Sequence, residues 1–386
     1  AIYLPFPQAV PSVFTLDEKS CLGLDPIRCG KCAEVCTPKA IDFDMRPEVF
    51  EVEAGAVVVA TGFDLYPMSK LGEYGGEKYE DVINGLEFER ILSASGPTGG
   101  QVRRPSDGRV PRDVVFIQCA GSRDPENHMP YCSKICCMYT AKHAMLYKHR
   151  VHDGNAHVFY IDVRTGGKDF EEFYHRTVEE DRVNYIRGKV SKVFKQGDKI
   201  VVWGVDTLSG KKVEVKADLV VLALPLIPSA GTDELFKKLR LSTNKHGFIQ
   251  EAHPKLRPVE HPNSGFYLAG VAQGPKDIPE AVAQASGAAA KVDALFSAAE
   301  LLREPTTAEV NDLCDGCAFC VDPCPVQAVT LVEYARDGET KKKVEVNQAL
   351  CLGCGVCMAT CPKKGIFVRN FTADRFLSMV DAMLTD

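Results

Sequence analysis

Sixteen cysteines are the residues of this sequence whose types and spacing most clearly indicate chemistry. They fall in three blocks, at residues 21–36, 119–137 and 314–361. We expect a cytosolic protein, and the thiol pool of the cytosol keeps cysteines reduced. The cysteines are therefore predicted to be metal or cluster ligands rather than disulfide partners.

The last block contains the same cysteine spacing twice. CDGCAFCVDPCP (314–325) and CLGCGVCMATCP (351–362) each follow C-x2-C-x2-C-x3-C-P, the bacterial ferredoxin pattern. In that pattern three cysteines of one run and the fourth of the other hold each 4Fe-4S cluster, because three thiolates on a tight loop cover one face of a cubane. The expected ligand sets are Cys314, Cys317, Cys320 and Cys361 for one cluster, and Cys351, Cys354, Cys357 and Cys324 for the other. Zinc is the alternative, but this spacing suits its paired ligands badly.

The first block has one related run with a wider first gap. CLGLDPIRCGKCAEVC (21–36) reads C-x7-C-x2-C-x3-C and contains the candidate ligands Cys21, Cys29, Cys32 and Cys36. By the ferredoxin rule Cys36 would reach a second cluster whose other ligands lie on another segment. A self-contained site that uses all four cysteines is the competing interpretation.

The middle block matches none of the common metal-ligand spacings. CAGSRDPENHMPYCSKICC (119–137) contains Cys119, Cys132, Cys136 and Cys137. The end of a strand and the start of the next helix lie close together in a βαβ unit, and a helix N-terminus favours thiolate. The four cysteines could therefore hold one further cluster, which would bring all sixteen into use. Buried structural cysteines or a redox-active pair at Cys136 and Cys137 are the alternatives, and His128 is interpreted as a loop-surface residue.

A glycine-punctuated turn before a long helix suggests a flavin site. In two-dinucleotide-binding flavoproteins a late strand and helix bring a helix N-terminus to the flavin, and YLAGVAQGPKDIPEAVAQAS (267–286) has this order. The candidate FAD contacts are Thr61, Gly62, Gly270, Gln273, Gly274, Lys276, Asp277 and Ile278. Two features depart from the pattern: Val271 replaces the usual Asp, and no G-x-G-x-x-G follows a strand. An α/β core without a cofactor is the alternative.

The elements that would position these residues follow an α/β pattern. Buried strands are predicted at 54–62, 113–121, 156–164, 217–225 and 265–270, helices at 134–150 and 278–302, a meander at 189–216, and a linker at 301–312. Residues 113–164 would form one βαβ unit. We select no catalytic acid, base or nucleophile.

Bulk properties limit the possible partners. A chain of 386 residues suggests two or three domains, and its net charge of -6 gives no reason to expect nucleic acid as a partner. No apolar run is long enough for a membrane span, and no signal peptide is evident, so we expect a cytoplasmic location without direct membrane insertion. The chain starts with Ala1, so it is expected to be processed or to begin inside a longer reading frame.

The sequence resembles the A subunit of heterodisulfide reductase, the flavin and iron-sulfur subunit of electron-bifurcating complexes in methanogens and related anaerobes. The resemblance covers nearly the whole chain, including AIYLPFPQAVP, IQCAGSRD, PYCSKICCM, EEFY, YIRGKV, AGVAQGPKDIPEAVAQAS and the double ferredoxin run. It implies a partial thioredoxin-reductase-like FAD-binding fold of the α/β class. The implied domains are the second half of an inserted ferredoxin-like domain (1–50), a flavoprotein domain (51–302) whose cluster-binding middle unit spans about 113–225, and a C-terminal two-cluster ferredoxin domain (303–386).

The resemblance also implies a function. Cys119, Cys132, Cys136 and Cys137 would hold a non-standard 4Fe-4S cluster, so that about four clusters and an FAD shared with a partner chain would transfer electrons. Implied partners are a chain with the Gly-rich FAD half and the other ferredoxin half, B-like and C-like subunits, and ferredoxin or a donor linked to hydrogenase or formate dehydrogenase. Alternatives are the same module in a quinone-interacting oxidoreductase or benzoyl-CoA reductase, and a relay without flavin. The chain would be a split subunit or a fragment.

Overall fold

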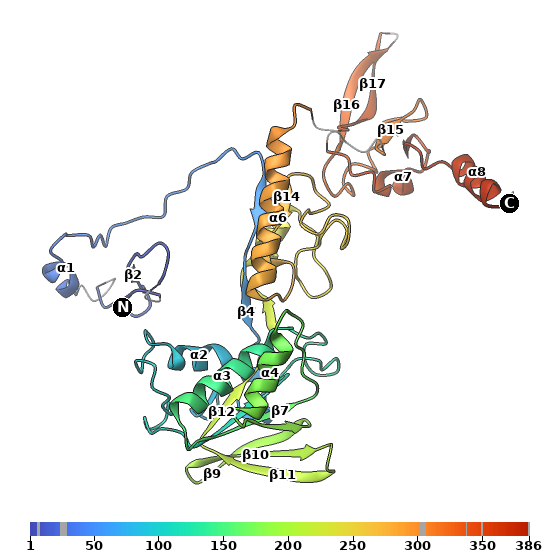
Figure 1. Ribbon diagram of the computed structural model, residues 1–386. Helices are drawn as coiled ribbons and strands as arrows, with labels where there is room; N and C mark the ends of the chain where they lie inside the picture. Colours follow the sequence, from blue (N-terminus) through green and yellow to red (C-terminus); the bar gives the residue numbers. More distant parts are fainter. Residues whose placement is uncertain (6–7, 24–28, 301–305, 337, 349, 385–386) are drawn as a thin grey trace.

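The computed structural model describes residues 1–5, 8–23, 29–300, 306–336, 338–348 and 350–384. Its N-terminal part contains a short antiparallel pair, β1 (Ile2–Tyr3) with β2 (Thr15–Leu16), and the helix α1 (Lys31–Val35). An extended stretch, 37–56, contains no helix or strand and connects this part to the rest of the chain (Figure 1). Within the described residues no helix has the length and apolar character that a membrane span requires.

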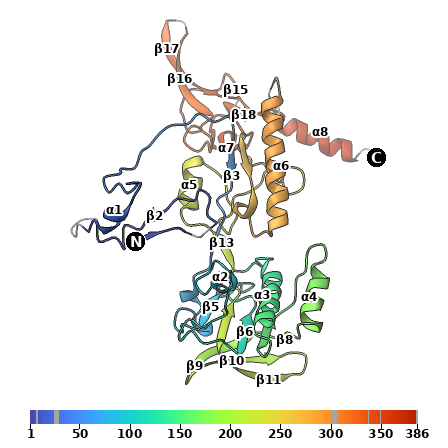
Figure 2. The same cartoon turned by 60° about the vertical axis from the view of Figure 1, so that its left-hand side comes forward.

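A small parallel pair of strands supports the long helix α6. The strand β3 (Val57–Val59) pairs with β14 (Phe266–Leu268), and α6 (Ile278–Ser297) lies alongside them (Figure 1). The short helix η3 (Gly270–Ala272) and α5 (Thr232–Leu239) belong to the same region, where Val59, Phe236 and Leu268 share a small core. The antiparallel pair β4 (Phe63–Leu65) and β13 (Leu226–Pro228) leads from this part into the middle of the molecule (Figure 2).

The middle of the molecule is a five-stranded parallel sheet in the order β5-β12-β6-β7-β8. Its strands are β5 (Val82–Asn84), β12 (Leu219–Leu222), β6 (Asp113–Ile117), β7 (Asn155–Tyr160) and β8 (Asn184–Arg187), and its helices are α2 (Gly85–Leu92), α3 (Cys136–Arg150) and α4 (Phe170–Glu179). Apolar runs such as VVFI and LVVL are buried on both faces, as expected for parallel strands covered on two sides. The helices cover one face, and the other face packs against a meander.

The meander consists of three antiparallel strands, β9 (Val190–Gln196), β10 (Lys199–Asp206) and β11 (Lys211–Ala217). Its turns contain Gly197 and Gly210 with positive φ, a conformation that glycine adopts without steric cost. Val202 of β10 and Phe159 of β7 belong to one buried cluster, so the meander closes the second face of the sheet.

The C-terminal part consists of two antiparallel pairs and two helices. The pairs are β15 (Ala308–Val310) with β18 (Ile366–Val368) and β16 (Val329–Arg336) with β17 (Glu339–Val346), and the helices are α7 (Val356–Thr360) and α8 (Ala373–Leu384). Two further short helices, η1 (Met68–Lys70) and η2 (Gly72–Tyr74), precede the middle sheet in the chain.

The sequence predicted most of these elements and misplaced several ends. The βαβ unit is confirmed, but α3 begins at Cys136 rather than at Lys134, because Lys134 has a φ of 64° that an α-helix does not accommodate. The predicted burial of the 54–62 strand is wrong in part: Val57 and Val58 are exposed, because β14 is the only partner of β3 among the described residues.

The predicted helix 278–302 and linker 301–312 also need correction. The helix α6 ends at Ser297, and the linker contains the strand β15, which pairs with β18. Residues 301–305, where the predicted helix ends and the predicted C-terminal domain begins, lie outside the described residues. The same is true of residues 6–7 in AIYLPFPQAVP and residues 24–28 in the first cysteine block.

Candidate functional site

The four cysteines of the middle block lie together at the carboxyl edge of the parallel sheet. Cys119 lies two residues after the end of β6, and Cys136 and Cys137 are the first residues of α3. The Cys136 thiol lies 3.9 Å from the carbonyl oxygen of Leu224 after β12, and the Cys137 thiol lies 3.8 Å from that of Asp162 after β7. Three strand ends therefore surround the thiols, as a βαβ arrangement requires.

Burial and mutual repulsion act on these thiols. Burial, followed by the charge of Cys137 and then of Cys132, raises the pKa of Cys119 to about 11, although Arg123 opposes the shift. Burial also raises the pKa of Cys136 and Cys137, and Cys136 lies within electrostatic reach of the other three cysteines. Since only thiolate is a ligand, a metal group would have to displace these protons, and four converging sulfurs fit a 4Fe-4S cluster.

The loop that contains Cys132 has further polar contacts. The backbone N–H of Lys134 donates to the Cys132 sulfur at 3.2 Å, and hydrogen bonds to sulfur are one means of setting a cluster potential. Arg123 forms a 2.7 Å ion pair with Asp162 at the rim of the same site.

The prediction of His128 as a loop-surface residue is wrong in part, because its side chain is only 12% exposed and contacts Tyr66 and Glu73.

In the C-terminal part, cysteines from both runs line one cavity. Its lining includes Cys351, Cys354 and Cys357 from the second run and Cys324 from the first. Burial raises the pKa of Cys357 to about 11, and the charges of Cys351 and Cys354 act in the same direction. The sulfurs of Cys324 and Cys351 accept backbone N–H groups at 3.2 and 3.3 Å. This donor set fits the second predicted cluster.

The complementary set surrounds Cys320. Burial raises the pKa of this thiol, and the charges of Cys361, Cys314 and Cys317 raise it further, so these three cysteines lie within electrostatic reach. The Cys361 sulfur accepts the N–H of Gly365 at 3.2 Å. The two sets that the ferredoxin rule predicts are therefore each brought together in the fold. Cys320 and Cys357 are buried in the core of this part, which makes the candidate ligands part of its packing.

In the N-terminal block, the two ends of the wide gap come together. The N–H of Cys29 donates to the carbonyl oxygen of Leu22 at 3.1 Å, which returns Cys21 towards Cys29. The sulfurs of Cys21 and Cys36 accept the backbone N–H groups of Gly23 and Ala40 at 3.3 Å each. Cys32 lies on α1, and all four thiols are partly exposed.

Across the part of the chain that the structure describes, no group of three or more His, Cys, Asp or Glu side chains has the geometry to hold a single metal ion. A cubane 4Fe-4S cluster requires a different geometry from a single metal ion, because its four thiolates bind four separate corners of the cluster.

Three of the eight expected flavin residues line one large cleft. The cleft has a volume of about 1090 Å³, and Lys276, Asp277 and Ile278 line it from the start of α6. Lys134 and Ile135 line it from the cysteine loop. Thr61, Gly62, Gly270, Gln273 and Gly274 are not among the lining residues; Thr61 instead accepts a hydrogen bond from Ser229, and Gln273 donates one to Glu251.

The start of α6 has features that suit the ring end of a flavin. Asp277 caps the helix: its side chain accepts the N–H of Glu280 at 2.8 Å, and the Glu280 carboxylate accepts the N–H of Asp277 at 3.2 Å. Gly274 has a φ of 154°, and an added Cβ would meet no atom within 4 Å, so open space borders the backbone there. Burial lowers the pKa of Lys276. Apolar cleft residues such as Met138 and Val271 complete the fit to a flat aromatic ring.

Two charged residues of this site were not selected from the sequence. Lys134 forms an ion pair with Glu280, which joins the cysteine loop to the first turn of α6. The spacing of Asp277 and Glu280 is a capping-box signature that could have marked the helix start. Nothing local in the sequence pairs Lys134 with a residue 146 positions away.

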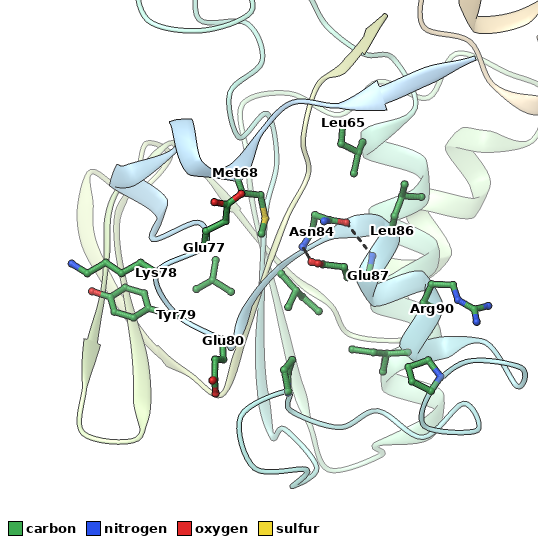
Figure 3. Close-up of a pocket in the computed structure, with 15 residues that line it drawn as sticks. Leu65, Met68, Glu77, Lys78, Tyr79, Glu80, Asn84, Leu86, Glu87 and Arg90 are labelled. Carbon is green, nitrogen blue, oxygen red and sulfur yellow. Dashed lines mark hydrogen bonds between the residues drawn. The ribbon is translucent and has the colours of Figure 1, made fainter. Parts of the chain in front are cut away.

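A second hollow, of about 880 Å³, lies beside β5 and α2 (Figure 3). Its wall includes Tyr79 and Arg90, and the capping box between Asn84 and Glu87 closes one side. None of the predicted site residues lines it.

Comparisons with known proteins identify relatives of both the whole chain and its C-terminal part. Residues 313–365 match the family model of the 4Fe-4S dicluster domain. The chain is 46% identical over 335 residues to the A subunit of the H(2):CoB-CoM heterodisulfide,ferredoxin reductase of Methanothermobacter thermautotrophicus, covering 86% of this chain and 50% of the relative. It is 43% identical over 387 residues to the iron-sulfur A subunit of the CoB-CoM heterodisulfide reductase of Methanocaldococcus jannaschii, covering 100% of this chain and 58% of the relative. The chain thus spans about half the length of such relatives.

Among solved structures, the thioredoxin reductase of T. acidophilum matches with a TM-score of 0.42 and 17% identity, covering 63% of this chain and 66% of that chain. The thioredoxin reductase of Lactococcus lactis matches with a TM-score of 0.38 and 15% identity, covering 62% and 65%.

Proposed function

The chain belongs to the family of heterodisulfide reductase A subunits, and from that premise we propose that it is an electron-transfer subunit of an oxidoreductase complex of this type. The complex would pass electrons between a low-potential ferredoxin-type carrier and a disulfide-reducing partner subunit, and the flavin would be the point of electron bifurcation. Names of relatives support the ferredoxin link, since that from Methanosarcina acetivorans is the A subunit of a Ferredoxin/F(420)H(2)-dependent CoB-CoM heterodisulfide reductase.

One observation carries the proposal: the cleft is shared between the cysteine loop and the start of α6. Lys134 and Ile135, next to the middle cysteines, line the same cleft as Lys276 and Asp277. A flavin ring at the start of α6 would therefore have a group bound by the middle cysteines as its neighbour. When bound, FAD exchanges electrons in pairs or singly, and iron-sulfur clusters exchange them singly.

The residues of this chain would bind these groups and set their potentials. All sixteen cysteines would be cluster ligands, in the four sets described above. The N-terminal N–H groups of α6, which Asp277 orders, would stabilise negative charge on the ring. Lys276 would add a cation at the ring edge, and the buried walls around Cys119 and Cys136 would exclude water. Residues outside this sequence would supply the remainder of the FAD site and of the N-terminal cluster pair.

Two alternatives share the iron-sulfur part of this proposal. The module could serve in a related complex, a quinone-interacting oxidoreductase or a benzoyl-CoA reductase, and the identity of the co-purifying chains would distinguish these. A relay without flavin is the second, and Val271 in place of an Asp at the expected flavin turn favours it.

The test is anaerobic purification of the intact assembly, with mass spectrometry of its chains and assays of flavin and iron per copy of this chain. We expect stoichiometric flavin, B-like and C-like subunits, and about sixteen irons attributable to this chain, four for each of its four cysteine sets. Cys132→Ser should remove about four irons, whereas Met138→Leu on α3 should remove none. Iron without flavin would reduce the chain to a relay, and an unchanged iron content in Cys132→Ser would refute the middle cluster.

A further inference from the structure

Lys134 and Glu280 connect two parts of the molecule that each contain a candidate redox site. Lys134 lies between Cys132 and Cys136, and its backbone N–H donates to the Cys132 sulfur at 3.2 Å. Its ammonium group forms an ion pair with the carboxylate of Glu280, in the first turn of α6. A single side-chain contact therefore ties the cysteine loop to the turn with the expected flavin residues.

The carboxylate of Glu280 interacts with two cations. Its charge acts on Lys276 as well as on Lys134, and the two lysines repel each other across the same cleft. One carboxylate thus offsets part of the charge of two ammonium groups. Its other oxygen accepts the N–H of Asp277, which fixes the carboxylate relative to the helix.

Other cations of this region have different partners. Arg123 and Arg164, whose charges act on Cys119 and Cys137, both pair with Asp162, at 2.7 and 3.4 Å. Lys142, further along α3, pairs with Glu89 at 2.8 Å. Lys134 and Lys142 have similar exposure, 42% and 44%, and both line the cleft. Lys142 therefore provides a matched comparison on α3, at a greater distance along the chain from the cysteines.

We propose that Lys134 and Glu280 are a positioning pair that fixes the Cys132 loop against α6 and sets, through their opposite charges, the reduction potential of the group bound by the middle cysteines. The inference rests on the proposed function, because it assumes a cluster at these cysteines. An added electron is stabilised by a nearby cation and destabilised by a nearby carboxylate, so the two residues act in opposite directions.

Substitutions can separate this electrostatic role from simple support. Lys134→Met removes the cation and should lower the potential of the middle cluster. Glu280→Gln removes the anion but keeps a side chain that completes a capping box, and it should raise the potential. At a fixed applied potential each variant should change the ratio of reduced to oxidised cluster roughly tenfold. Lys134→Arg should stay near the parent value.

The measurement is a redox titration of the intact assembly. Electron paramagnetic resonance monitors the titration through the signal that Cys132→Ser removes. Iron content is determined for every variant. Lys142→Met is the control for loss of a cation on α3, and its shift should be much smaller than that of Lys134→Met. The exchanged pair, Lys134→Glu with Glu280→Lys, should keep the contact but lower the potential, because the anion now lies beside the cysteines.

The outcomes separate the two proposals. Shifts of the same sign in Lys134→Met and Glu280→Gln, no shift in either, or a parent-like potential in the exchanged pair would overturn the electrostatic role while leaving the cluster in place. A parent assembly in which Cys132→Ser removes neither iron nor a signal would instead overturn the proposed function, and this inference with it.

Discussion

Cys324 belongs to the first C-terminal cysteine run, yet it lines the same cavity as Cys351 of the second. The hairpin β16–β17 separates the two residues in sequence. Because its strands are antiparallel, the end of the hairpin lies beside its beginning. The cavity therefore contains one sulfur from the first run and three from the second, so each cysteine can be assigned to a cluster by substitution.

Cys324→Ser should perturb the cluster of the second run and leave that of the first intact. The reason is that Cys324 shares its cavity with Cys351, Cys354 and Cys357, whereas Cys361 is grouped with Cys320. Electron paramagnetic resonance of the reduced protein should lose or alter one ferredoxin-type signal, and Cys361→Ser should affect the other. Loss of the same signal in both variants would contradict the exchange of ligands between the runs.

Arg104→Met should destabilise the middle part of the protein by about 3–5 kcal/mol, the usual result of removing one partner of a buried ion pair. The guanidinium of Arg104 lies 2.9 Å from Asp81 and 3.5 Å from Asp218, and its side chain is 5% exposed. Urea denaturation measures the change. The neighbouring exposed Arg103→Met is the control and should stay within about 0.5 kcal/mol of the parent.

Asp277→Ala should cost about 1 kcal/mol through loss of the helix cap, and it should also weaken flavin retention. Asp277→Asn keeps an oxygen that accepts the N–H of Glu280, so its stability should stay close to that of the parent. Thermal unfolding and flavin content are the two measurements. Full stability in Asp277→Ala would show that the capping box contributes nothing to α6.

His261 should make stability depend on pH in mildly acidic solution. Burial lowers its pKa to about 4. Its Nδ1 accepts the backbone N–H of Asn263 at 2.9 Å, and its Nε2 lies 3.1 Å from the hydroxyl oxygen of Ser242. The folded state therefore favours the neutral ring, so stability is full above about pH 6.5 and falls as the pH drops towards 4, by up to about 3 kcal/mol. Unfolding between pH 7 and 4 should show a smaller dependence in His261→Gln than in the parent.

Local patterns explain what the sequence could predict. The strand β6, the turns at Gly197 and Gly210, and the two C-terminal cysteine runs each depend on residues a few positions apart. The strand β5 of the middle sheet was not predicted, because its two apolar residues, Val82 and Ile83, are too short a run to indicate a strand. The pairing of Lys134 with Glu280 depends on how two segments that are distant in the sequence fold together, so residue spacing cannot predict it.

The two-stranded sheet of β3 and β14 is open on one side. Residues 259–261 form backbone hydrogen bonds with β14, whereas no strand pairs with the outer edge of β3 within the described residues. Val57 and Val58 are exposed beside that edge. A short apolar strand with an open edge is a template on which other chains can extend a sheet. Recombinant production of this chain by itself should therefore yield aggregates, and co-expression with a chain that completes the sheet should increase the soluble yield.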